Sequence, residues 1–83
     1  MADYSDLVRK PWERGITPFR RATTYQRQKD GTHPPAMKIG RMSAWVAGEL
    51  AAVNRAITMG RSDDQIRQLV ADLVAQRRSG EGE

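Results

Sequence analysis

The chain has 83 residues, 39% of them hydrophobic, with no cysteine and a formal net charge of +4. This length allows one small domain with a modest core and excludes a large enzyme cleft. The lack of cysteine excludes a disulfide framework and a thiolate metal site. Because no apolar run approaches a membrane span and the first residues do not resemble a secretory signal, we expect a cytoplasmic protein.

The positive charge is concentrated in one segment, from Arg9 to Arg41. Nine Lys or Arg residues in it face two acids, Glu13 and Asp30, which gives a local charge of +7. From Met42 onward, five Arg face six acids. This segregation predicts a polyanionic partner, most simply the phosphate backbone of nucleic acid.

Two interpretations of the chain start stay open. One is a short helix over residues 11–14 that begins at a proline and ends at Gly15, with Trp12 and Ile16 as its core contacts. The other is a single helix from Leu7 that is kinked by the same proline.

The next predicted element is a helix over residues 19–30. Thr17 provides a cap and Pro18 suits the first turn, and the following residues contain no Gly or Pro. Most of this helix is polar, so we expect it to show the core a narrow stripe. The predicted stripe comprises Phe19, Ala22 and Tyr25.

A turn and a hairpin are predicted after this helix. Asp30-Gly31 is a turn signal, and Pro34-Pro35 requires an extended chain. Residues 37–45 then alternate in polarity with Gly40 at the centre, which predicts a small two-stranded wing.

Two helices are expected in the remaining chain. The first runs from Val46 to near Gly60, because one face carries apolar residues at helical spacing. The second follows Ser62-Asp63-Asp64-Gln65, which has the pattern of a capping box. It is expected to end where Arg77 and Arg78 complement the helix dipole, and the tail over residues 79–83 is expected to be disordered.

The last helix carries an apolar stripe with two alternative roles. It either packs against the preceding helix or docks onto a second copy of the protein. The stripe consists of Ile66, Leu69, Val70, Leu73 and Val74. The resulting organisation is a DNA-binding domain over 1–60, an amphipathic helix over 61–78 and a tail over 79–83.

This order of elements is typical of a winged helix-turn-helix. Five short motifs are similar to those of the AlpA-type and excisionase family of small phage and mobile-element regulators, which the chain resembles from about Ile16 to Ile57. The motifs are Arg21-Ala22-Thr23-Thr24-Tyr25, Lys29-Asp30-Gly31, Pro34, Lys38-Ile39-Gly40-Arg41 and Trp45. The chain departs from the family at His33, where the turn usually has an aromatic residue, and at Glu49, the single acid near the start of the helix after Trp45.

The order of elements and the resemblance together predict an α+β, mainly α fold: a winged helix-turn-helix with a short two-stranded wing, followed by the additional C-terminal helix that the residue pattern predicts. The resemblance also implies a recombination directionality factor that binds attachment-site DNA cooperatively, promotes integrase-mediated excision and also regulates transcription. The implied partners are double-stranded DNA, further copies along the DNA and an integrase, with no membrane, and the bound protein would be nucleoid-associated. Two alternatives stay open: an AlpA-type transcriptional regulator without a recombination role, and a protein-interaction adaptor that uses the C-terminal helix.

The predicted DNA contacts come from the basic helix and the wing. Cationic side chains are expected on phosphates or guanines, and hydroxyl and amide groups on base edges or backbone oxygens. These residues are Arg20, Arg21, Thr23, Thr24, Gln26, Arg27, Lys29, Lys38 and Arg41. We expect no catalytic residue, metal or cofactor, because His33 alone cannot complete a coordination shell and Asp63 and Asp64 serve as caps. Phe19, Tyr25 and Trp45 are assigned to the core rather than to base stacking.

Overall fold

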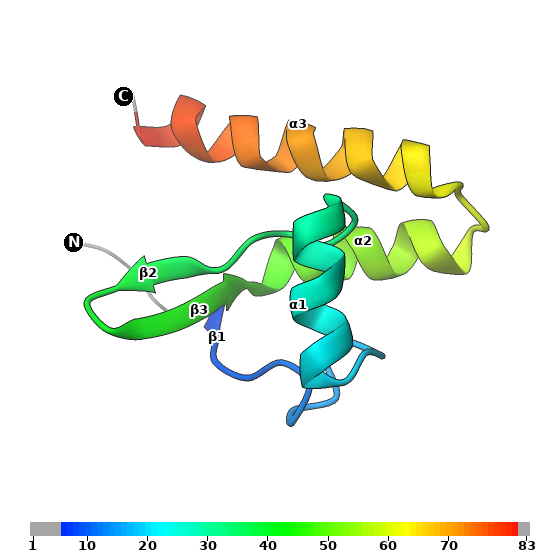
Figure 1. Cartoon of the computed structure of the whole chain (residues 1–83). Helices are drawn as coiled ribbons and strands as arrows, with labels where there is room; N and C mark the ends of the chain where they lie inside the picture. The colour runs from blue at the N-terminus through cyan, green and yellow to red at the C-terminus, as the bar shows by residue number, and fades with distance from the viewer. Residues whose placement is uncertain (1–5, 82–83) are drawn as a thin grey trace.

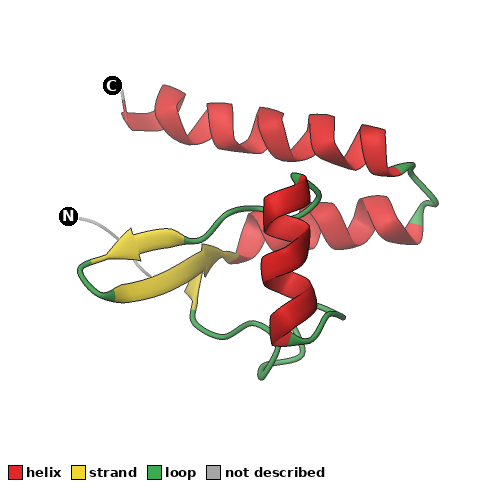
Figure 2. Ribbon diagram, in the orientation of Figure 1, coloured by secondary structure: helices red, strands yellow, loops and turns green. Residues whose placement is uncertain are grey.

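The computed structural model describes residues 6–81, the last four of them by backbone alone. Within this range the chain forms three helices and a three-stranded antiparallel sheet (Figures 1 and 2). The elements are β1 (Leu7–Val8), α1 (Arg21–Asp30), β2 (Met37–Ile39), β3 (Met42–Val46), α2 (Ala47–Thr58) and α3 (Asp63–Glu81). The predicted α+β class with mainly helical content is therefore confirmed.

The sheet has the order β1-β3-β2, so β3 is its central strand. The hairpin of β2 and β3 pairs Ile39 with Met42, and Gly40 takes a left-handed φ of +62° in the turn between them. The predicted hairpin is confirmed. The sheet is larger than the predicted two-stranded wing because Val8 of β1 pairs with Trp45 on the other edge of β3.

Both predicted forms of the first helix are wrong. Leu7 lies in a strand, and residues 11–14 form successive turns rather than a helix. Lys10 adopts a left-handed φ of +47°, and Pro11, which follows it, has no amide hydrogen to donate. The turn closes through a bond from the Ile16 amide to the Pro11 carbonyl at 3.2 Å.

Helix α1 begins later than the sequence predicts. Its N-cap is Arg20, which makes no side-chain capping bond, whereas the predicted cap, Thr17, is buried in the preceding loop. The C-terminus agrees with the prediction. Gly31 has a φ of +81°, and the Thr32 amide donates to the Arg27 carbonyl at 2.9 Å.

The buried face of α1 is polar, which corrects the predicted apolar stripe. Thr24 is fully buried, and Gln28 accepts a hydrogen bond of 2.7 Å from Trp45 Nε1. Ala22 is exposed and Tyr25 is 39% exposed, so neither is a core residue of this helix. The hydrogen bond to Trp45 explains the difference, because it lets an amide side chain face the sheet without losing a partner.

Helices α2 and α3 run antiparallel and share the apolar core, whereas α1 stands across them (Figure 1). Val53 and Ala56 of α2 pack against Ile66 and Val70 of α3. The α2 helix starts at Ala47 rather than Val46, which ends β3. The predicted capping box of α3 is confirmed, since the Gln65 amide donates to Ser62 Oγ at 3.2 Å and the Ser62 amide donates to Gln65 Oε1 at 2.9 Å.

The apolar stripe of α3 packs within the chain. Ile66 and Val70 are 2% and 6% exposed, so their assignment to self-association is wrong in this conformation. Leu69, Leu73 and Val74 are partly buried against the same cluster. This is the packing alternative that the sequence left open.

The C-terminal half of α3 is tied to the rest of the fold by Arg77. Its Nε donates to Glu49 Oε2 at 2.7 Å. Its Nη2 donates both to Glu49 Oε1 and to the Pro35 carbonyl, the latter at 2.9 Å. The predicted helix end at Arg78 is wrong because α3 continues to Glu81. Of the predicted tail, residues 82–83 lie outside the described residues.

No helix in the described range is both long and apolar enough to span a membrane.

His33 makes folding stability dependent on pH. Burial lowers its pKa from the usual 6.5; the bond from Nδ1 to the Pro34 carbonyl, 2.9 Å, acts in the opposite direction, and the nearby Arg27 lowers it further. The folded state binds the His33 proton less well than the unfolded state does. The contribution of neutral His33 to the unfolding free energy is therefore complete above pH 6.5 and is lost as the pH falls through the lower pKa of the folded state.

We therefore expect His33→Phe to lose less unfolding free energy than the wild type between about pH 7 and about pH 5. The aromatic replacement retains the packing beside Phe19, whose ring centroid lies 6.2 Å from that of His33. Urea unfolding at several pH values measures the difference. Identical pH dependence in the two proteins would contradict the assignment.

Candidate nucleic-acid interface

The face of α1 that points away from the core carries Ala22, Gln26 and Lys29. With 3.6 residues per turn, these positions lie opposite the inward-facing Thr24 and Gln28. All three are exposed. The small side chain of Ala22 lies one turn before Gln26, so the N-terminal end of this face allows a close approach to another surface.

Seven of the nine predicted contact residues are exposed in the structure. They are Arg20, Arg21, Thr23, Gln26, Lys29, Lys38 and Arg41. Of the other two, Thr24 is buried and Arg27 is partly buried. Thr24 is 0% exposed, and the Arg27 guanidinium lies 4.5 Å from the Phe19 ring centroid with its Nε buried. The assignment of Thr24 as a DNA contact is therefore wrong in this conformation, whereas that of Arg27 stays a prediction.

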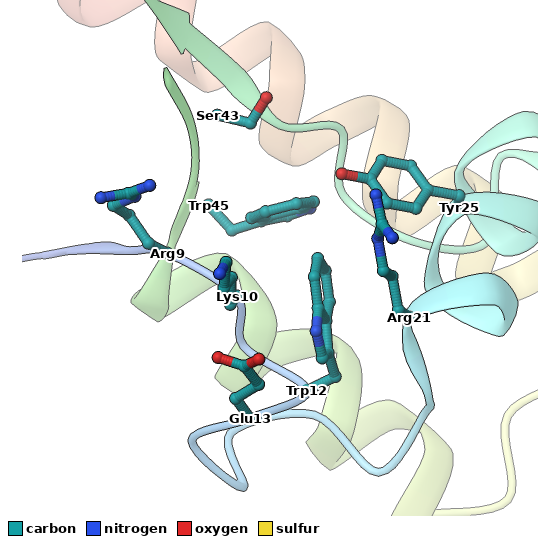
Figure 3. A pocket seen from close by; sticks show the side chains of 8 residues that line it. All are labelled: Arg9, Lys10, Trp12, Glu13, Arg21, Tyr25, Ser43 and Trp45. Carbon is teal, nitrogen blue, oxygen red and sulfur yellow. The ribbon is translucent and has the colours of Figure 1, made fainter. Parts of the chain in front are cut away.

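A pocket of about 310 Å³ opens where the chain start, α1 and the sheet meet (Figure 3). Arg9 and Lys10 reach it from the end of β1, Arg21 from the start of α1 and Ser43 from β3. These segments are far apart in the sequence. Because β1 pairs with β3, Arg9 and Lys10 come to lie beside Ser43 and the start of α1.

Aromatic rings form the floor of this pocket. Trp12 packs edge-to-face on Trp45 with ring centroids 5.4 Å apart, and Tyr25 lies 5.8 Å from Trp12 and 6.1 Å from Trp45. Trp45 is 1% exposed, whereas Tyr25 reaches the surface beside the Arg21 guanidinium, 5.9 Å from its ring centroid. The rings fix the position of α1 against the sheet.

The wing contributes to the same basic surface. Lys38 Nζ of β2 donates to Ser43 Oγ at 2.7 Å, and Ser43 lines the pocket. Lys38 of the hairpin is therefore held on the side where Arg21 and Lys10 lie. Basic groups from β1, α1 and the hairpin converge on one region.

Among the side chains described, over residues 6–77, none of these cations is paired with a carboxylate. The two ion pairs in the described part of the chain join Arg67 to Asp64 and Arg77 to Glu49, both outside the basic segment. Gln26 donates a long bond of 3.4 Å to Asp30, one of the two acids of the segment. The positive charge predicted from the sequence is thus directed to solvent.

Sequence reasoning missed five residues of this surface: Arg9, Lys10, Trp12, Ala22 and Tyr25. Arg9 and Lys10 belong to the basic segment, but no local pattern indicated that they would lie beside α1. Ala22 and Tyr25 were assigned to the core because their spacing is helical. Alternation at Leu7 and Val8 is too short to identify a strand.

Comparison of the chain with protein-family models, with curated proteins and with solved structures finds no match.

Proposed function

We propose that this protein binds double-stranded DNA, with the outward face of α1 in the major groove and the β2–β3 hairpin on the sugar-phosphate backbone. This is the docking of a winged helix-turn-helix, in which α1 is the recognition helix. The turns of residues 11–15 take the place of the first helix of that motif. The helical diameter and the exposed polar face of α1 suit the width of the major groove.

The observation that carries the proposal is the convergence of basic side chains from three segments on one side of the molecule. Arg21 and Lys10 line one pocket, and Lys38 is bonded to Ser43 at its edge. A solvated helix with no partner has no need for such convergence. A duplex presents phosphates on both sides of a groove, which requires cations on both the helix and the flanking hairpin.

The base-reading part of the proposal rests on fewer residues than the sequence suggested. Gln26 offers an amide that matches the donor and acceptor of adenine, and Ala22 offers a methyl group to thymine. Both are exposed on the outward face, Ala22 in the first turn of α1 and Gln26 one turn later. Lys29 and Arg20 flank them and are placed for phosphates.

For the biological role we propose an excisionase-like recombination directionality factor of a mobile element, which binds attachment-site DNA and biases an integrase toward excision. This step rests on the motif resemblance from Ile16 to Ile57. An AlpA-type transcriptional regulator begins with the same DNA contact. Footprinting on an attachment site and on the promoters of the element distinguishes the two roles.

Salt titration tests the DNA contact. Affinity for a mixed-sequence duplex should fall steeply with salt, with log K changing by about −0.9 per unit of log salt for each phosphate neutralised. Arg21→Gln/Lys29→Gln removes two of these cations, so the slope should become shallower by about 0.9 for each phosphate that no longer has a cationic partner.

The matched control is Arg55→Gln/Arg61→Gln. It removes the same charge from exposed positions at the end of α2 and the following loop, outside the basic segment. We expect it to keep the wild-type slope within about one half of a phosphate. Equal slopes for the two double variants would show that overall charge, and not this surface, determines binding.

A further inference from the structure

We propose that the pocket between β1, α1 and β3 binds a phosphate through Arg9, Lys10 and Arg21. The inference deepens the proposed DNA binding, on which it rests: it assigns a specific pocket and two further residues to one phosphate of the backbone. The duplex supplies this group as a phosphodiester, and free inorganic phosphate presents the same oxyanion chemistry.

The charge of the pocket favours an anion. Three cationic side chains line it, and Glu13 is the one carboxylate among its described lining residues. Arg9 and Lys10 are exposed and form none of the described ion pairs. Guanidinium groups bind phosphate oxygens in pairs, and an ammonium adds a point charge.

The backbone at Lys10 supports a binding role. Its φ of +47° is a conformation that a residue with a Cβ rarely adopts. This conformation sits at the corner where the chain leaves β1, so that Arg9 and Lys10 both line the pocket. Strained residues of this kind concentrate at functional sites.

The aromatic floor disfavours an unstacked base as the occupant. Trp12 and Trp45 pack edge-to-face, and Trp45 is 1% exposed, so no parallel slot is left between the rings. Arg21 already lies over the ring of Tyr25. The rings instead form an apolar surface that strengthens the attraction between the cations and an anion above it.

The volume of the pocket agrees with a phosphate group as the occupant. About 310 Å³ is at the lower end of the range of small-molecule pockets. A phosphate with part of its sugar fits such a space. A large cofactor does not.

Fluorescence offers a local measurement because the protein has two tryptophans and both line this pocket. Duplex DNA and, separately, inorganic phosphate at low ionic strength should change the tryptophan emission of the wild type. Arg9→Gln/Lys10→Gln should abolish the change with phosphate and should make the salt slope for duplex shallower by about 0.9, one phosphate. Arg55→Gln/Arg61→Gln, with the same charge loss, should resemble the wild type.

A variant with stronger binding excludes unfolding as the cause. Glu13→Gln removes the carboxylate of the pocket and should tighten phosphate binding and duplex binding together.

If Arg9→Gln/Lys10→Gln matches the Arg55→Gln/Arg61→Gln control while the wild type binds duplex, the phosphate site is refuted and DNA binding stands. If the wild type binds no duplex but phosphate changes its emission through Arg9 and Lys10, the phosphate site stands and DNA binding is refuted. An emission change that needs an unpaired base would overturn the assignment to phosphate.

Discussion

Trp45→Ala is expected to lower the free energy of unfolding by about 3 to 5 kcal/mol. Trp45 is 1% exposed, contacts the rings of Trp12 and Tyr25, and donates from Nε1 to Gln28. Its removal leaves a cavity between α1 and the sheet and an amide without its partner. Because a domain of this size has stability on the order of 5 kcal/mol, about 0 to 2 kcal/mol should remain, so the variant should be marginally stable, with up to about half of the molecules unfolded in water.

The matched control is Trp45→Phe, which keeps a ring in the same space and loses the hydrogen bond to Gln28. Its expected cost is about 1 to 2 kcal/mol. Urea unfolding followed by far-ultraviolet circular dichroism measures both variants, since tryptophan emission changes with the substitution itself. A Trp45→Ala protein as stable as Trp45→Phe would contradict the role given to this side chain.

Arg77→Met is expected to destabilise the protein by about 3 to 5 kcal/mol, because it leaves the Glu49 carboxylate buried without its cation. It also removes the hydrogen bond to the Pro35 carbonyl, and this bond joins α3 to the segment that precedes β2. Thermal and urea unfolding should show the loss at neutral pH.

Two comparisons make this prediction specific. Arg77→Met/Glu49→Met replaces the pair by apolar side chains and should recover most of the lost stability. Arg67→Met breaks the exposed pair with Asp64 on the same helix and the bond from Arg67 Nε to the Asp30 carbonyl, 2.8 Å, and should cost about 1 to 2 kcal/mol. Equal losses for Arg67→Met and Arg77→Met would show that burial of Glu49 does not govern the effect.

Elements with strong local signals were predicted correctly. The capping box from Ser62 to Gln65 fixes the start of α3, and Gly31 fixes the end of α1 through a left-handed conformation that other residues adopt at a cost. The hairpin around Gly40 follows from alternation over a few residues. These signals need no knowledge of distant contacts.

Features that depend on contacts distant in sequence were not predicted. Strand β1 has two residues and exists because Val8 pairs with Trp45. The buried face of α1 holds Gln28 because Trp45 supplies a hydrogen-bond donor there, and it also holds the fully buried Thr24. Neither partner is visible in the local pattern, which instead favoured the apolar spacing of Ala22 and Tyr25.

The candidate site shows the same division. Exposure of Arg20, Arg21, Gln26 and Lys29 could be anticipated from the polar composition of the helix. The pocket could not, because it needs β1, α1 and β3 to meet. An amphipathic stripe such as that of α3 has the same pattern whether its partner is in the same chain or in a second copy, so the sequence left both alternatives open.

The most direct test of the account is to map the surface that duplex DNA touches. Backbone amide chemical shifts of the labelled protein should be followed while a mixed-sequence duplex two helical turns long is added at low salt. The account predicts that the largest changes lie at Ala22, Gln26 and Lys29 of α1, at the Gly40–Arg41 turn and at Arg9 and Lys10, with little change along the exposed face of α3. Changes centred on α3, or none at saturating duplex, would contradict it.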